Sequence, residues 1–183
     1  REFAEYRIQQ LRDPACTLYE APATFLSPYR LQVGSTCLAA KSFIIATGSV
    51  PRDAAIPGLT EAGCVTSDSL LDRREQPESL IVLGAGPVGL EFAQFFARIG
   101  TQVTLVQRAP HVLSHLDADV GVALGQALAA EGLRVMTDTQ ALRVQRDGKK
   151  TAVSVMHKGE EEVLAGDLVL NALGRVPNIA GLN

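Results

Sequence analysis

The chain has no tryptophan, few aromatic residues (5% of 183 positions) and only three cysteines. Cys16, Cys37 and Cys64 are far apart, so no CxxC or CxxxxC spacing offers a zinc knuckle or a redox dithiol. An odd cysteine count without a secretion signal argues for a reducing compartment. We therefore expect a cytoplasmic protein whose cysteines are small buried hydrophobic residues.

Long apolar runs and basic clusters are also missing. The longest apolar run, Ser79–Leu90, contains three glycines and a proline, whereas a membrane-spanning helix needs about 20 apolar residues. Acidic residues outnumber basic ones by 20 to 17, a net charge of −3, and there is no Lys/Arg run for nucleic-acid phosphates. Neither a membrane nor a nucleic-acid partner is expected. The 46% of hydrophobic residues predicts a globular core instead.

The first half of the chain has mixed secondary-structure signals. Apolar spacing predicts a helix over Glu2–Arg12 that stops at Asp13-Pro14. Residues 50–78 are predicted to be a connector with at most one short helix. Strands are expected at Thr17–Glu20, Tyr29–Val33, Cys37–Ala39 and, as a buried strand, Ser42–Thr47.

The second half alternates strands and helices. A helix after Pro87 is expected to end at Gly100, and a second is capped by Asp117 and closed by Gly132. Their predicted inward-facing residues are Val88, Phe92, Phe95, Phe96 and Ile99 in the first helix, and Val120, Leu124, Ala127 and Leu128 in the second. Strands are predicted at Leu80–Leu83, Gln102–Gln107, Arg134–Met136, Ala141–Gln145, Ala152–His157 and Leu168–Leu173.

This order predicts an α/β fold of the Rossmann-like type, with a parallel sheet and a β-meander. An internal repeat supports two related units: Tyr29–Pro51 and Val155–Pro177 align without gaps and share six identical residues. Both segments read as strand, turn, strand, buried strand and then Gly-x-Val-Pro. We interpret the first copy as part of a second nucleotide-binding unit.

A glycine motif, Gly84, Gly86 and Gly89, directly follows the buried strand and opens a helix. In a βαβ unit, the first glycine allows the tight turn, the second lets the backbone approach a pyrophosphate, and the third lets the helix pack on the strand. Pro87 suits the first helical position because its missing N–H would be unpaired there. The motif predicts dinucleotide binding, with phosphates on the positive helix end.

The end of the next strand decides which dinucleotide is bound. An NAD site usually offers an acidic residue there, whereas this chain has Gln107 and Arg108. A guanidinium can pair with a 2′-phosphate, so NADP is favoured over NAD. His111 and His115 lie downstream, and we interpret them as loop or phosphate-rim residues. No metal site is predicted.

Five stretches of the chain together form a family pattern: Ile44–Ser49 with Pro51, Ile56–Gly58, Thr66–Asp68, Gly84–Gly89 with Glu91, and Ala172–Asn178. In these stretches the chain resembles the pyridine nucleotide–disulfide oxidoreductases, the flavoprotein group of glutathione reductase, dihydrolipoamide dehydrogenase and mercuric reductase. The run from Leu90 to Arg98 looks most like the mercuric-reductase branch.

The resemblance implies specific site residues and a reaction. Thr47 and Gly48 would lie beside FAD, and Ala23 would border its adenine. Glu91, which also complements the helix dipole, would place the nicotinamide against the flavin. The reaction implied is hydride transfer from NAD(P)H to FAD and then onward to a disulfide. The nicotinamide dinucleotide would be held by Gly84, Gly86, Pro87, Val88 and Gly89, and bordered by Gly174.

The family's N-terminal FAD fingerprint, its CxxxxC pair, its later Gly-Asp and its C-terminal dimerisation domain do not occur here. We therefore expect a central fragment, inactive alone, of an enzyme that is a homodimer. Residues 1–77 would be the end of an FAD-binding domain with a connector, and 78–183 an NAD(P)H-binding domain. The terminal acceptor, such as a disulfide, mercuric ion or quinone, stays open.

Two alternatives to this interpretation stay open. The first is a free-standing, non-catalytic NAD(P)H-binding module, which an encoded start and stop around these residues would favour. The second is a single-domain Rossmann dehydrogenase, which would need a proton donor such as a neighbouring Tyr and Lys. All three tyrosines, Tyr6, Tyr19 and Tyr29, precede the glycine motif, which disfavours that reading.

Overall fold

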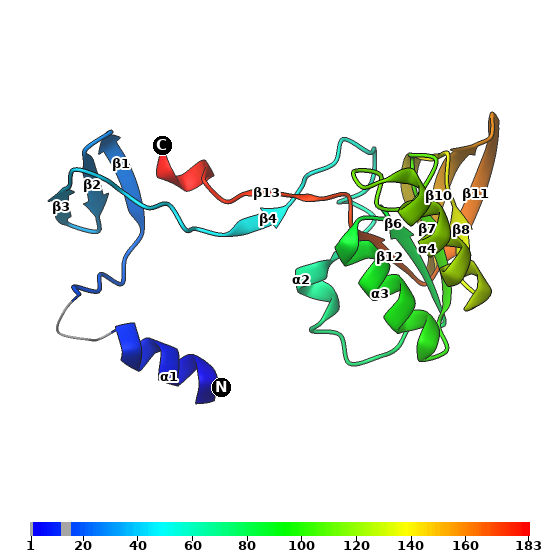
Figure 1. The fold of residues 1–183 in the computed structure, drawn as a ribbon, viewed down its shortest axis with the longest axis horizontal. Coiled ribbons are helices and arrows are strands. Elements are labelled where there is room, and N and C mark those ends of the chain that lie inside the picture. The colour runs from blue at the N-terminus through cyan, green and yellow to red at the C-terminus, as the bar shows by residue number, and fades with distance from the viewer. Residues whose placement is uncertain (1, 12–15) are drawn as a thin grey trace. The chain divides into compact units, whose positions relative to one another are not determined.

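A computed structural model describes residues 2–11 and 16–183, and its fold is drawn in Figure 1. Contacts divide the chain into two compact units. The first unit comprises residues 1–49 and 177–183, and the second comprises residues 50–176. The connector over 50–77 therefore clusters with the second unit, and the functional boundary at 77/78 stays a prediction.

The second unit is built on a five-stranded, all-parallel sheet, as the alternation of strands and helices predicts. The central strand β6 is apolar at four successive positions, Leu80–Leu83, which suits a strand covered on both faces. In spatial order the strands are β5 (Val65–Thr66), β12 (Leu168–Asn171), β6 (Ser79–Leu83), β7 (Gln102–Val106) and β8 (Arg134–Met136).

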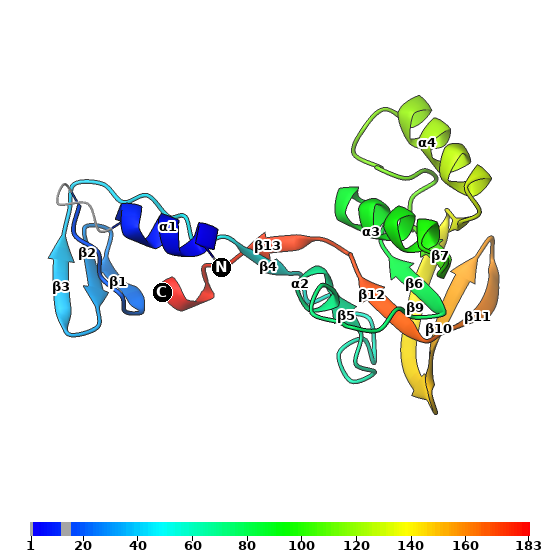
Figure 2. The same cartoon turned by 90° about the horizontal axis from the view of Figure 1, so that it is seen from below.

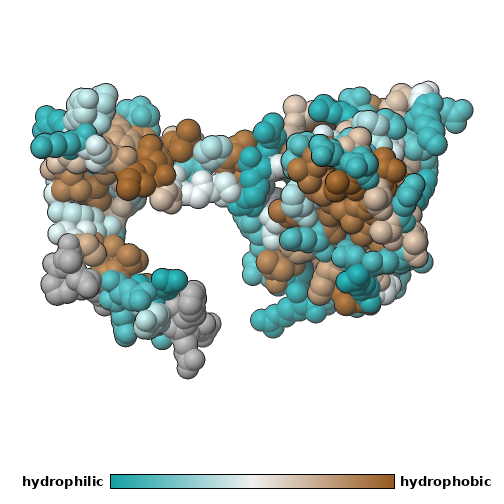
Figure 3. Space-filling view, viewed as in Figure 1, coloured by the Kyte–Doolittle hydropathy of each residue, from teal (hydrophilic) through white to brown (hydrophobic). Residues whose placement is uncertain are grey.

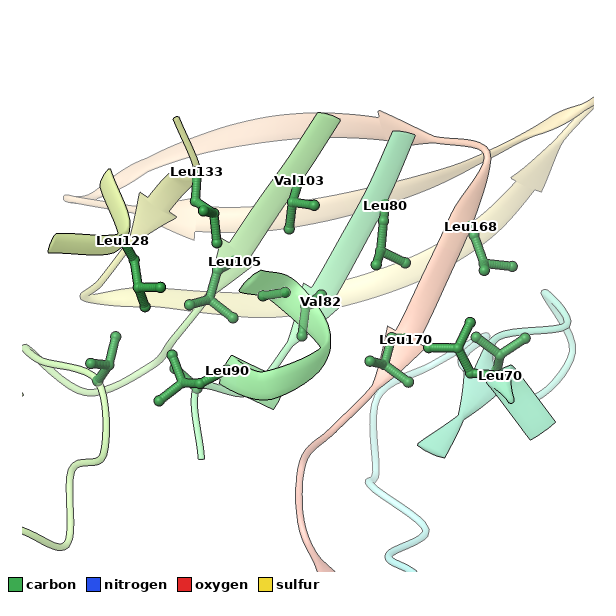
Figure 4. Close-up of a cluster of buried hydrophobic side chains, with 14 residues drawn as sticks. Leu70, Leu80, Val82, Leu90, Val103, Leu105, Leu128, Leu133, Leu168 and Leu170 are labelled. Atoms are coloured by element: carbon green, nitrogen blue, oxygen red, sulfur yellow. The ribbon is translucent and has the colours of Figure 1, made fainter. Parts of the chain in front are cut away.

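Two hydrophobic clusters fill the two faces of this sheet. Leu80 and Val82 point to the face covered by helices α3 (Pro87–Arg98) and α4 (Ala118–Ala130), where Leu90 and Leu128 join them (Figure 4). Ile81 and Leu83 point to the opposite face, as alternation along a strand requires.

A three-stranded antiparallel meander covers that opposite face (Figure 2). The predicted meander is confirmed, and its turns lie at Gly148 and Gly159. Val144, Val153 and Val155 supply its buried side chains. The strands are β9 (Thr139–Asp147), β10 (Lys150–His157) and β11 (Glu160–Gly166).

Both predicted helices form, but their buried faces differ from the prediction. In α3 the buried residues are Gly89, Leu90 and Ala93, while Phe95 is 57% and Ile99 44% exposed. Phe92 and Phe96 are partly buried against the same core, as predicted, and Gly89 and Ala93 let the helix lie close to the sheet. In α4, Leu128 is buried as predicted but Val120 is exposed, and Asp117 precedes the helix without a side-chain capping hydrogen bond. Val88, also predicted to face inward, is 37% exposed.

The first unit contains helix α1 (Glu2–Leu11) and an antiparallel sheet in the order β1-β2-β3. The predicted end of the helix at Asp13-Pro14 lies outside the described residues. Strand β1 was not predicted, and Thr17–Glu20, where a strand was predicted, forms none. The three strands are β1 (Ala23–Ser27), β2 (Arg30–Val33) and β3 (Thr36–Ala39).

The predicted buried strand at Ser42–Thr47 is wrong. These residues form no strand, and Ile44 is 95% exposed. Apolar side chains consequently reach the surface (Figure 3). A strand of this kind is buried only inside a sheet whose two faces are covered, and among the described residues no strand pairs with this run.

A short two-stranded ladder joins the two copies of the internal repeat. Strand β4 (Ser49–Pro51) pairs with β13 (Arg175–Pro177), and these are equivalent positions in the aligned segments. The strand–turn–strand part is present in both copies, as β2–β3 and β10–β11. The chain ends in a short 3-10 turn, η1 (Ala180–Leu182), and Thr24 of β1 donates a hydrogen bond to the carbonyl of Gly181.

Between β5 and β6 lies the connector's one α-helix, α2 (Ser67–Leu70), as predicted. Cys16 and Cys37 are exposed, so the prediction that all cysteines are buried is wrong for these two; Cys64 is partly buried. Across residues 2–11 and 16–183, no helix has the length and apolar character needed to cross a membrane.

Candidate nucleotide-binding site

The turn Gly84–Gly89, here called the glycine turn, joins β6 to α3. Gly84 has φ +101°, and its N–H donates to the carbonyl of Val106 at 2.9 Å. A β-carbon at Gly84 would lie 2.5 Å from the carbonyl oxygen of Ala172. Both the backbone conformation and the space therefore require glycine at this position.

Gly89 lies where α3 crosses the strand end. A β-carbon here would collide with the carbonyl oxygen of Gly84 and would lie 3.2 Å from the β-carbon of Ala172. The helix can approach the strand only because this position has no side chain. The close packing matches the role that the glycine spacing predicts.

Gly86 differs from the other two glycines of the turn. It is the N-cap of α3 with ordinary φ (−78°), and a β-carbon built on it would meet no atom within 4 Å. The N-cap makes no side-chain hydrogen bond, and Pro87 at the first helical position has no N–H. The first N–H groups of α3 have no partner inside the helix and carry its positive end, so they can hold an anion.

Three neighbouring parallel strands end at the same edge of the sheet. Leu83 is in register with Val106 on one side and Asn171 on the other. The glycine turn therefore lies between Gln107-Arg108, after β7, and the segment leading to Gly174, after β12. This edge is where open α/β sheets bind ligands.

Gln107 and Arg108 differ in their availability. The N–H of Gln107 donates to the carbonyl of Met136 at 2.8 Å, and its Nε2 donates to the carbonyl of His111. Arg108 is exposed, and within the described part of the chain no side-chain hydrogen bond or ion pair engages its guanidinium. Of the two residues, Arg108 is the one free to bind a phosphate.

The two histidines downstream do not form a metal site. His111 is partly buried, packs against Gly121 of α4 and lies with Nδ1 2.9 Å from the carbonyl oxygen of Val112, whereas His115 is exposed. No cluster of three His, Cys, Asp or Glu side chains suited to a metal occurs among residues 2–11 and 16–183.

Gly174 lies at the far side of the glycine turn, two residues after Ala172. It has φ +114°, and its carbonyl accepts a hydrogen bond from the N–H of Arg52 at 2.9 Å. The N–H of Ala172 donates to the carbonyl of Leu83, also at 2.9 Å. The segment is thus joined by backbone hydrogen bonds to both β6 and the connector.

Glu91 lies in the second turn of α3 and is exposed. It borders a cavity of about 480 Å³, whose apolar lining includes Leu70, Phe92 and Phe95. No glycine of the glycine turn lines this cavity. The cavity shares Glu91 with the candidate site but does not include the anion-binding helix end.

The predicted FAD-bordering residues lie in the first unit. Gly48 has φ +73°, and its carbonyl accepts a hydrogen bond from the N–H of Asn178 at 3.0 Å. The side-chain amide of Asn178 donates to the carbonyl of Thr47. Thr47 and Gly48 are exposed, and Ala23 begins β1 opposite Val33. Their role at a flavin stays a prediction.

Sequence reasoning missed an ion pair beside the site. Arg175 Nη1 donates to Asp68 Oδ1 at 2.8 Å, and this bond holds the pKa of Asp68 below its usual value. Both residues lie in stretches that match the family, but 107 positions separate them. No local spacing could have joined them.

Cys64, the one cysteine of the second unit, is unsuited to redox chemistry. Burial raises the pKa of Cys64 to about 11, so it is a thiol rather than a thiolate at neutral pH. All three cysteines are free.

The parallel sheet, the glycine turn and the helix that begins at Pro87 define an α/β protein with a glycine-rich turn at the carboxyl edge of its sheet. The profile of the family described as pyridine nucleotide-disulphide oxidoreductase matches residues 5–183, and the chain belongs to this family.

The chain is similar to several named enzymes. It is 35% identical over 179 residues to a mercuric reductase of Staphylococcus aureus, covering 98% of this chain and 33% of that protein. It is also 35% identical to a dihydrolipoyl dehydrogenase of Thermus scotoductus, covering 87% of this chain and 35% of the relative. The chain thus spans about a third of the length of these relatives.

A solved structure confirms the fold. The HOCl-induced flavoprotein disulfide reductase RclA of Escherichia coli superposes with a TM-score of 0.86 at 28% identity. The match covers 100% of this chain and 42% of the RclA chain.

Proposed function

We propose that this chain is the NAD(P)H-binding segment of an FAD-dependent pyridine nucleotide–disulfide oxidoreductase. Residues 78–183 bind the nicotinamide dinucleotide, and residues 1–77 contribute to the FAD site. One observation supports this above all. The glycine turn leaves free space over Gly86, at the N-terminal end of α3, while Gly84 and Gly89 are in tight contact with their surroundings.

The pyrophosphate binds over Gly86, where backbone N–H groups of α3 provide the hydrogen bonds. Arg108 pairs with a 2′-phosphate, which favours NADP over NAD, because its guanidinium has no partner among the described residues. Gly174 follows β12 and Arg108 follows β7, and these two strands flank β6 on opposite sides. Gly174 and Glu91 border and orient the nicotinamide half.

A bound FAD would supply the redox chemistry, as acceptor of the hydride and donor of electrons to a disulfide or a related acceptor. The residues of this chain that we place beside the flavin are Ala23, Thr47 and Gly48. The backbone at Gly48 is open, since a β-carbon there would meet nothing within 4 Å, and this fits a neighbouring group. The sequence has only one GxGxxG motif, and we assign it to the nicotinamide dinucleotide because it lies at the carboxyl edge of the parallel sheet.

The chain alone therefore does not hold FAD firmly and does not turn over a disulfide. Its three free cysteines offer no neighbouring pair, and Cys64 has a raised pKa. Catalysis by the parent protein needs further FAD-binding and dimerisation segments, in which we place the redox pair. A homodimeric parent follows from the same resemblance.

Calorimetric titration of the purified chain with NADPH and NADH tests this function. We expect saturable binding of both, with NADPH the tighter ligand. Absence of heat with either dinucleotide at millimolar concentration, from a chain whose circular dichroism shows it folded, would refute the proposal.

A further inference from the structure

The segment Ala172–Gly174 forms one wall of the glycine turn. Its carbonyl oxygen at Ala172 faces Gly84, and the β-carbon of Ala172 faces Gly89. The N–H of Ala172 is bonded to the carbonyl of Leu83. Any displacement of this segment therefore changes the space beside the turn.

The end of this wall is held by a bidentate ion pair. Arg175 Nη1 donates to Asp68 Oδ1 at 2.8 Å, and Nη2 donates to Asp68 Oδ2 at 3.3 Å. Arg175 Nη1 also donates to Ser67 Oγ, whose hydroxyl donates to Asp68 Oδ1. The planar guanidinium engages both carboxylate oxygens, which defines its orientation.

Asp68 is itself held in place by local structure. It lies in the first turn of α2, where Thr66 and Ser69 form a reciprocal capping box. Thr66 is in β5, in register with Asn171 of β12. The ion pair therefore connects the end of the wall back to the sheet from which the wall emerges.

The start of the wall has a second attachment. The side-chain amide of Asn171 donates to the carbonyl of Arg52 at 3.3 Å, and its Oδ1 accepts from the N–H of Leu173 at 3.2 Å. The N–H of Arg52 donates to the carbonyl of Gly174. With Asn171 at one end and Arg175 at the other, the three wall residues are held from both sides.

We propose that Asp68 and Arg175 are positioning residues that set the placement of Ala172–Gly174, and through it the affinity for the nicotinamide half of the dinucleotide. The inference rests on the proposed function. An exposed ion pair contributes little to overall stability, and the side chains of Arg175 and Asp68 are 33% and 59% exposed. The ion pair therefore acts locally, on the placement of the wall residues Ala172–Gly174.

The test compares two ligands that differ only in the nicotinamide. NADH carries it, whereas ADP-ribose has the same adenosine and pyrophosphate without it. Asp68→Ala and Arg175→Ala should each weaken NADH binding by roughly three- to tenfold, a range typical of the loss of a bidentate ion pair. ADP-ribose binding should change less than about twofold, and the double variant should bind NADH no worse than either single variant.

Glu131→Ala is the matched control. It removes a second bidentate ion pair of the same unit. In this pair Arg98 Nε donates to Glu131 Oε2 at 2.9 Å, and Arg98 Nη2 donates to Glu131 Oε1 at 3.0 Å. This pair links α3 to the residue after α4 and does not touch the wall. Glu131→Ala should leave the affinity for both ligands unchanged.

Amide hydrogen exchange of the free chain provides a readout without nucleotide. Exchange at Ala172–Arg175 should be faster in Asp68→Ala than in the wild type and unchanged in Glu131→Ala. Unchanged exchange, or equal loss of NADH and ADP-ribose affinity, would overturn the inference. If the wild type binds neither ligand while exchange responds as expected, the proposed function fails, and the ion pair keeps only its role in holding the wall.

Discussion

The carbonyl oxygen of Ala172 lies 2.5 Å from the point where a β-carbon on Gly84 would be. Two segments 88 positions apart, one after β6 and one after β12, therefore come into direct contact at the proposed phosphate site. Gly84 also has φ +101°, a conformation that residues with side chains rarely adopt.

Gly84→Ala should consequently destabilise the fold strongly. Strain from positive φ and the clash with Ala172 together predict a loss of about 3 kcal/mol in the free energy of unfolding. Urea denaturation followed by circular dichroism measures it. Gly132→Ala is the control: its φ is +97°, but a β-carbon there meets nothing within 4 Å, so only about 1 kcal/mol should be lost. Equal losses in the two variants would show that Ala172 does not limit this position.

Gly86→Ala, in contrast, should leave the stability of the fold intact and weaken dinucleotide binding. The added methyl group meets no protein atom but occupies the space above the first turn of α3. Losing a charge-assisted backbone contact should weaken dinucleotide binding by roughly tenfold. Calorimetry with NADPH measures this, and Gly125→Ala in α4, where a β-carbon also has room, should bind as the wild type does. Unchanged affinity in Gly86→Ala would place the phosphates elsewhere.

Local sequence signals sufficed for the core of the second unit. Continuous apolar strands such as Leu80–Leu83 and the glycine motif predict β6, β7, β12 and α3. The 3.6-residue period predicted α3, and Phe92 and Phe96 pack against the core as expected. Phe95 and Ile99 instead remain exposed, and the buried residues of the helix are Gly89, Leu90 and Ala93.

The rest depends on contacts between distant parts of the chain. Ile44 and Ile45 have the composition of a buried strand, but burial requires neighbouring strands, and the described residues provide none. The Asp68–Arg175 pair forms because β5 and β12 are neighbours in the sheet. Strand order is a property of the fold, so single-sequence patterns could not reveal it.

Arg108→Ala should reduce the preference for NADPH. Loss of a guanidinium–phosphate contact should weaken NADPH binding by roughly 10- to 100-fold, with less than about threefold effect on NADH, which lacks the 2′-phosphate. Parallel titrations with the two dinucleotides measure the ratio. Arg143→Ala, an exposed arginine on the meander, is the control for net charge. An equal effect of Arg108→Ala on both ligands would contradict the assignment to the 2′-phosphate.

Acid stability should depend on Asp167, which closes the loop between β11 and β12. Ser79 Oγ donates to Asp167 Oδ2 at 2.6 Å and the Ser79 N–H donates to the same oxygen at 2.9 Å. These bonds hold the pKa of Asp167 below its usual value of 3.8. A carboxyl group with a lowered folded-state pKa stabilises the fold above the unfolded value, and this contribution is lost as the pH falls through the folded value.

The wild type should therefore lose stability as the pH falls below about 4, and Asp167→Asn should show a shallower loss in that range with lower stability at pH 7. Thermal unfolding midpoints between pH 7 and pH 2.5 measure both effects. Asp117→Asn is the comparison, because Asp117 makes no capping hydrogen bond at α4 and its removal should leave the slope unchanged. If Asp167→Asn loses stability with acid as steeply as the wild type, the bonds from Ser79 do not favour the ionised carboxylate.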